Sequence, residues 1–223
     1  MNTSHSHTTP PAPDWFTKKL AASGIEPDYA VNTLKFRIVK AAEANRLLGF
    51  WNTGWPDAFA IPFFDPETGA AMTTPDGRDF VRLRLERPVV MHDGKEAKYL
   101  SPVEGGQHAY ILPDVHRQLV DNPTDPVLLT EGELKAICAT QRGVPMIGLP
   151  GIDGFSGTDK RLLPELVHYA TKGRVFCMIY DSDAAVPEKQ KKFEEAAERF
   201  AIALARHGCR LERVILPSLE VAP

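Results

Sequence analysis

The sequence has 223 residues, enough for one large domain or two small ones with a buried core. Hydrophobic residues make up 43% and charged residues 25%, as in ordinary globular proteins, and the net charge of −3 excludes a generally basic nucleic-acid-binding protein. No apolar run approaches the roughly 20 residues that span a bilayer, and the N-terminus lacks a secretory pattern, so we expect a cytoplasmic protein without a membrane partner.

The first part of the chain predicts two helices followed by a small antiparallel β region. Residues 1–13 are polar and rich in Thr, Ser, His and Pro, and we expect a disordered arm. Helices are expected from Asp14 to about Gly24 and over Ala41–Leu48. Short strands with turn residues between them follow, namely AFAIPFF, FVRLRLE, PVVMH, AKYLSP and HAYILP. The Pro- and Asp-rich segment VDNPTDP predicts a boundary between a domain at 14–120 and another at 121–223.

The second part alternates strands with helices. The strands are expected at Val127–Thr130, Pro145–Leu149, Arg174–Tyr180 and Leu211–Leu216, and the helices at Glu133–Gln141, Asp159–Thr171 and Glu188–Arg206. Four apolar strands separated by helices predict a Rossmann-like sheet, mostly parallel and flanked by helices. The fold class is therefore α/β in this part and α+β for the chain with its antiparallel N-terminal region.

Acidic residues follow two of these strands directly. Glu131-Gly132 comes after VLLT, and Asp181-Ser182-Asp183 comes after VFCMIY. Ligands bind at the carboxyl ends of strands in such sheets, so the three carboxylates are expected to converge. A cation must then neutralise them, and oxygen ligands of this kind suit Mg²⁺ or Mn²⁺. The alternative is that Asp181 or Asp183 caps the helix that begins near Pro187.

These segments resemble a known family. VLLTEGELKAICATQRGVPMIGLPG followed by VFCMIYDSDAA is similar to the Toprim domain of primases, topoisomerases and related nucleases. The resemblance implies that Glu131 is a general acid/base or metal ligand, and that Asp181 and Asp183 hold metal. It also implies that Gly132 allows a tight strand-to-helix turn beside phosphates.

The upstream segments extend the resemblance to primases. AIPFFDPETG, FVRLRLE, GKEAKYLSP and AYILP follow the order of motifs in bacterial primase cores, and the variant is similar to the Toprim-like domain of phage and plasmid primase-helicase proteins. Two departures stand out: the second acidic motif lacks a following Gly, and the chain ends at LPSLEVAP without a further Gly/Asp-Asp segment. It also has no zinc module and no helicase phosphate loop. We therefore expect a fragment of a larger primase-helicase or an element protein that relies on a partner.

Basic residues in the β region are candidates for nucleotide or template binding. Arg82 and Arg84 are two residues apart on one strand and share a face. Lys98 and Tyr99 belong to the KYLSP run. The alternative for the two arginines is a solvated strand face, with Leu83 and Leu85 turned inward.

Three functions compete. The first is a Mg- or Mn-dependent primase, a nucleotidyltransferase that makes short RNA primers from NTPs on single-stranded DNA for replication of a mobile element. The second is a Toprim nuclease that cleaves phosphodiesters. The third is a non-catalytic module that binds nucleic acid, a helicase, another replication protein or a host factor.

Overall fold

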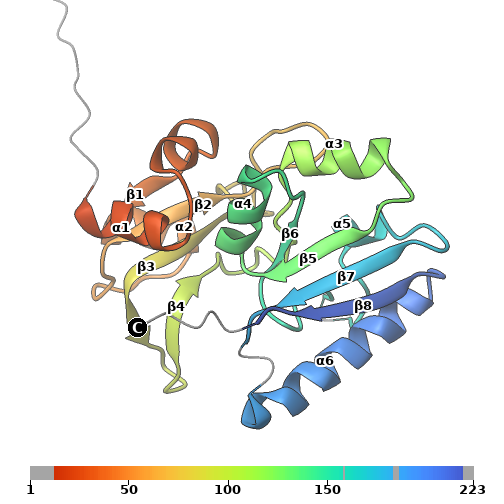
Figure 1. The fold of residues 1–223 in the computed structure, drawn as a ribbon. Helices are drawn as coiled ribbons and strands as arrows, with labels where there is room; N and C mark the ends of the chain where they lie inside the picture. Colours follow the sequence, from red (N-terminus) through yellow and green to blue (C-terminus); the bar gives the residue numbers. More distant parts are fainter. Residues whose placement is uncertain (1–12, 158, 183–185, 218–223) are drawn as a thin grey trace, which may run out of the picture.

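Two four-stranded sheets form the framework of the protein (Figure 1). The computed structural model describes residues 13–157, 159–182 and 186–217. The helices are α1 (Asp14–Ala22), the π-helix η1 (Tyr29–Thr33), α2 (Ala41–Leu48), α3 (Pro113–Asp121), α4 (Glu133–Gln141), α5 (Pro164–Val167) and α6 (Pro187–Ala205). The strands are β1 (Arg37–Val39), β2 (Ala58–Pro62), β3 (Val81–Val90), β4 (Glu96–Leu100), β5 (Val127–Glu131), β6 (Ile147–Leu149), β7 (Val175–Tyr180) and β8 (Arg210–Ile215).

The first sheet is antiparallel, as predicted, with the strand order β1-β2-β3-β4. The predicted runs FVRLRLE and PVVMH form one long strand, β3, whose pairing with β4 shifts between Arg84 and Val89. Leu83 and Leu85 are fully buried, because alternate residues of a strand face opposite sides of the sheet. Arg82 therefore lies on the other face, half-buried.

The second sheet has the order β6-β5-β7-β8, and all its neighbouring strands are parallel. This confirms the predicted four-stranded parallel sheet flanked by helices. Helix α4 packs on β5 and β6, and α6 packs along β8 (Figure 1). Parallel strands joined through helices place all their carboxyl ends at one edge of the sheet.

One hydrophobic core joins the two parts of the chain. It contains Phe16 and Phe59 from the N-terminal part, and Leu129 and Phe176 from the parallel sheet. A smaller cluster under α2 includes Leu47. The boundary at residue 120 stays a prediction, and the shared core ties the two parts together. Of the predicted arm, residues 1–13, all but Pro13 lie outside the described residues.

Two predicted elements are wrong. The helix expected at Asp159–Thr171 is reduced to α5. Pro164 has no N–H to donate and holds the preceding Leu163 extended, with φ −54° and ψ 139°. The run HAYILP forms no strand. Its Tyr110 makes a single bridge to Gly148, with backbone N–O distances of 2.7 and 2.9 Å, and α3 begins directly afterwards.

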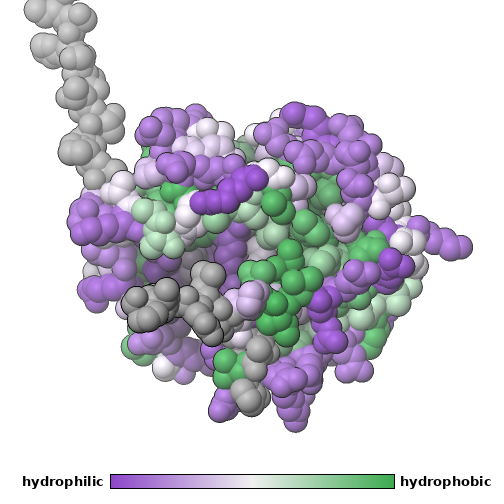
Figure 2. Space-filling model, viewed as in Figure 1, coloured by the Kyte–Doolittle hydropathy of each residue, from purple (hydrophilic) through white to green (hydrophobic). Residues whose placement is uncertain are grey.

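The surface is mixed in character. In the space-filling view, hydrophilic side chains cover most of the visible face, and hydrophobic ones gather near its middle over the parallel sheet (Figure 2). The edge strand β8 exposes Val214 and Ile215. Within the described ranges, no helix is both long and apolar enough to cross a membrane.

His108 gives the fold a testable pH dependence. Its Nδ1 lies 2.5 Å from Glu165 Oε1 and its Nε2 lies 2.9 Å from the Gly105 carbonyl oxygen. The hydrogen bond with Glu165 raises the pKa of His108 above its usual value, despite partial burial. A raised folded pKa stabilises the protein below the unfolded pKa of about 6.5, and this contribution is lost as pH rises through the folded value.

We therefore expect Glu165→Gln to destabilise the protein by about 1 kcal/mol at pH 6, and by less as the pH is raised toward 9. Urea unfolding of both proteins across this range measures the difference. A difference that stays constant or grows with pH would contradict the charged pair.

Candidate functional site

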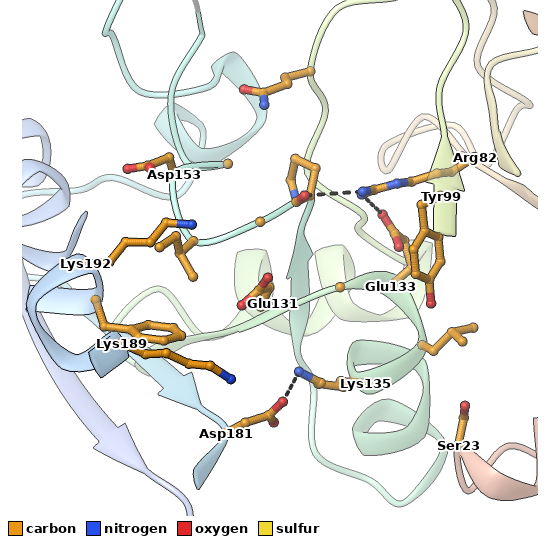
Figure 3. Close-up of a pocket in the computed structure, with 18 of the residues that line it drawn as sticks. Ser23, Arg82, Tyr99, Glu131, Glu133, Lys135, Asp153, Asp181, Lys189 and Lys192 are labelled. Atoms are coloured by element: carbon orange, nitrogen blue, oxygen red, sulfur yellow. Dashed lines mark hydrogen bonds and ion pairs between the residues drawn. The ribbon is translucent and has the colours of Figure 1, made fainter. Parts of the chain in front are cut away.

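A cleft of about 1000 Å³ opens at the carboxyl edge of the parallel sheet (Figure 3). Its walls come from both parts of the chain: α1, β3 and β4 on one side, and β5, α4, the loop after β6 and α6 on the other. Its charged lining residues are Lys19, Arg82, Glu131, Glu133, Lys135, Asp153, Asp181, Lys189 and Lys192.

Glu131 and Asp181 both line this cleft. Glu131 is the last residue of β5, and Asp181 follows the last residue of the neighbouring strand β7. Thr130 pairs with Ile179 in the parallel register, so Glu131 lies level with Tyr180 and Asp181 lies one residue further along. The charge of Glu131 contributes to the raised pKa of Tyr180, although burial is the larger cause. The sheet thus brings two of the three predicted carboxylates together.

Asp181 forms an ion pair with Lys135 of α4 (Figure 3). About half of each side chain is exposed, with 47% for Asp181 and 45% for Lys135. Asp181 does not cap α6, whose N-cap is Val186, and no described side chain caps its first turn. The capping alternative is therefore wrong for Asp181.

The third predicted ligand, Asp183, lies outside the described residues. In the part of the chain that the structure describes, no three His, Cys, Asp or Glu side chains are grouped so that they could hold a metal ion. Glu131 and Asp181 are oxygen donors on adjacent strand ends, and they fit Mg²⁺ or Mn²⁺ as a pair that substrate phosphates and water would complete. The metal site remains a proposal.

Arg82 does not extend freely into the cleft. Its Nη1 donates to Glu133 Oε1 at 2.7 Å and its Nη2 donates to the Pro150 carbonyl oxygen at 3.3 Å. Glu133 is almost fully buried, with 2% of its side chain exposed. Arg82 therefore connects the antiparallel sheet to the start of α4 and to the loop after β6.

Tyr99 packs against both arginines of β3. The guanidinium carbons of Arg82 and Arg84 lie 5.1 and 5.2 Å from the centre of its ring, within cation–π range. Burial raises the pKa of Tyr99. Tyr99 lines the cleft beside Arg82, and its predicted role in nucleotide binding stays a prediction.

Arg84 and Lys98 lie outside the lining of the cleft but close to Lys19, which lines it. Burial lowers the pKa of Lys19, and the charges of Arg84 and Lys98 lower it further. None of these three cations forms an ion pair with a described acidic residue. They make a local basic region, the N-terminal basic group, on a protein whose net charge is negative.

Gly132 makes the tight strand-to-helix turn that was predicted for it. Its φ of 92° is accessible to glycine and costly for other residues. Its N–H donates to the Leu149 carbonyl oxygen at 2.7 Å, which fixes the loop after β6 beside Glu131.

Sequence reasoning missed five charged residues of the cleft: Lys19, Glu133, Lys135, Lys189 and Lys192. Glu133 and Lys135 follow Glu131 at the start of α4, and Lys189 lies in the first turn of α6. Helices that follow strands begin at the carboxyl edge of a parallel sheet, so their first turns face the same site as the strand ends. This rule could have identified Glu133, Lys135 and Lys189 from the sequence.

The two sheets and the cleft between them define the class of fold: it is the fold of the RNA polymerase domain of bacterial primases. The structure is similar to that of the Aquifex aeolicus primase (zinc binding and RNA polymerase domains), with a TM-score of 0.57 and 15% identity over 93% of this chain. It is also similar to the RNA polymerase domain of Mycobacterium tuberculosis primase DnaG, with a TM-score of 0.60 and 12% identity over 92% of this chain.

The chain spans 51% of the Aquifex aeolicus structure and 69% of the Mycobacterium tuberculosis structure. At these identities the likeness establishes the fold. Residues 116–221 match a family described as a domain of unknown function (DUF3854). No curated protein matches the sequence.

Proposed function

We propose that this protein is a primase-like nucleotidyltransferase that makes short RNA primers on single-stranded DNA, for replication of a mobile element. The observation that carries the proposal is the position of Glu131 and Asp181 at the ends of two adjacent strands, on the carboxyl edge of the parallel sheet. Both carboxylates line one cleft with cationic side chains, in a chain with the fold of a primase polymerase domain.

The proposed reaction joins two nucleotides. The 3′-hydroxyl oxygen of one attacks the α-phosphorus of an incoming nucleoside triphosphate, the bond from that phosphorus to the oxygen bridging to the β-phosphorus breaks, and pyrophosphate leaves. The hydroxyl proton passes to Glu131 or to water. Mg²⁺ or Mn²⁺ would neutralise the phosphate charge and make the hydroxyl easier to deprotonate.

The roles of the chain's own residues follow from their positions. Glu131 and Asp181, with Asp183 as the third proposed ligand, would hold the metal. Tyr99 and the N-terminal basic group of Lys19, Arg84 and Lys98 would hold the template beside the cleft. Arg82 acts as a positioning residue, because its guanidinium already binds Glu133 and Pro150.

A primer-synthesis assay tests the proposal. The protein is incubated with single-stranded DNA of varied sequence, labelled NTPs and Mg²⁺ or Mn²⁺. We expect short RNA products that require both the template and the metal. Cleaved template without new RNA would select the nuclease, and binding of DNA without either product would select the non-catalytic module.

Lys135 offers a separate prediction about the metal. Its ammonium group neutralises Asp181 in the ion pair, so a divalent cation must compete with it for that carboxylate. We expect Lys135→Met to tighten Mn²⁺ binding by about three- to tenfold, since one nearby positive charge is removed. Titration calorimetry or Mn²⁺ electron paramagnetic resonance measures the change. Unchanged or weaker binding would show that Asp181 does not bind the metal.

A further inference from the structure

A pair of lysines on α6 lines the wall of the cleft opposite the antiparallel sheet. Lys189, Lys192 and Phe193 all line it, and their spacing of three and four residues puts them on one helix face. Figure 3 shows both lysine side chains extending from α6 toward the interior of the cleft, on the side where Asp181 and Glu131 lie. Phe193 packs edge-on against Tyr180, with ring centres 5.2 Å apart, and fixes this face on β7.

Three of the four acidic residues that line the cleft form ion pairs with cations other than Lys189 and Lys192. Glu133 pairs with Arg82, Asp181 pairs with Lys135, and Asp153 pairs with Arg199 at 2.6 Å. Among the described residues, none of these acids forms an ion pair with Lys192. Lys192 therefore contributes a positive charge to the cleft that none of these three acidic residues neutralises.

We propose that Lys189 and Lys192 bind the β- and γ-phosphates of the incoming nucleoside triphosphate. This inference rests on the proposed function, because it assigns a substrate group to the same cleft. Mg²⁺ is usually bound through one or two carboxylates together with substrate phosphates, so the triphosphate must lie beside Glu131 and Asp181. The α6 lysines line that part of the cleft, and ammonium groups bind phosphate as compact point charges.

The nucleic-acid backbone is a weaker candidate for this position. The N-terminal basic group lies toward the other wall and forms no ion pair with an acidic residue in the described part of the chain, so it is better placed for the template. The chain's net charge of −3 also argues against a basic surface that follows a long strand around the cleft.

The experiment compares Lys189→Gln/Lys192→Gln with wild type and with Lys191→Gln. Lys191 is a matched control on the same helix: its side chain is 87% exposed, it lies within 3.9 Å of Glu195, and it does not line the cleft. Glutamine keeps the helix propensity of lysine, so all three proteins should fold alike. The ligands are GTP, GDP, GMP and inorganic triphosphate with Mg²⁺, measured by calorimetry, and single-stranded DNA, measured by fluorescence anisotropy.

We expect the double variant to bind GTP and inorganic triphosphate about tenfold more weakly, GDP less so, and GMP as wild type does, because the lost contacts are to the outer phosphates. Lys191→Gln should change each affinity by less than about twofold. In primer synthesis, the KM for NTPs should rise while the apparent affinity for the template stays constant.

Two results would overturn the inference. One is wild-type GTP affinity in the double variant, and the other is a loss confined to single-stranded DNA, which would assign the lysines to the nucleic-acid backbone. Failure of the proposed function is a distinct outcome: GTP binding would depend on the two lysines, yet wild-type protein would make no primers on any template.

Discussion

Replacing Glu131 or Asp181 by Ala should reduce primer synthesis by about 10³-fold or more, with little change in stability. Both side chains are at least partly exposed at the ends of β5 and β7, so their removal leaves no buried cavity or unpaired buried charge. Loss of a metal ligand removes several kcal/mol of transition-state stabilisation, and each 1.36 kcal/mol is about tenfold in rate.

Asp114→Ala is the matched control for these variants. Asp114 is an exposed carboxylate in the first turn of α3, with 74% of its side chain accessible, and it does not line the cleft. Primer yield per minute is the measurement, with urea unfolding and Mn²⁺ titration on the same preparations. Primer synthesis that survives in Asp181→Ala, with the fold intact, would remove this carboxylate from the proposed mechanism.

The positions of Glu131 and Asp181 could be predicted because they depend on local rules. An apolar strand followed by an acidic residue, repeated in a strand–helix alternation, fixes both residues at one edge of a parallel sheet. The alternation of FVRLRLE likewise predicted the buried Leu83 and Leu85. These features require only chain periodicity and the geometry of adjacent elements.

The partners of the charged groups could not be predicted in this way. Arg82 was expected on an open basic face, yet it pairs with Glu133, 51 residues further along the chain. Lys135 meets Asp181 across 46 residues. Such pairs depend on how the two sheets pack through their shared core, which the periodicity of a single segment does not encode.

The ion pair between Arg82 and Glu133 should be the most sensitive polar contact for stability. Glu133 is 2% exposed and Arg82 is 17% exposed, so both groups have lost most of their hydration. Removal of one partner from a buried pair leaves an uncompensated charge and costs about 3–5 kcal/mol. We expect Arg82→Met to destabilise the protein by about this amount, measured by urea unfolding followed by tryptophan fluorescence.

The double variant Arg82→Met/Glu133→Gln should recover most of that loss, because it removes both charges and leaves side chains of similar size. Arg87→Met is the control: Arg87 is exposed on the same strand, and its replacement should cost less than about 0.5 kcal/mol. If Arg82→Met and Arg87→Met were equally stable, the pair would contribute nothing beyond a surface contact.

The ion pair between Arg82 and Glu133 also joins β3 to α4. The single variant Arg82→Met should therefore loosen the two walls of the cleft and lower primer synthesis. The double variant should regain stability without regaining full activity. That separation would show that the charge of Arg82 positions the cleft as well as stabilising the fold.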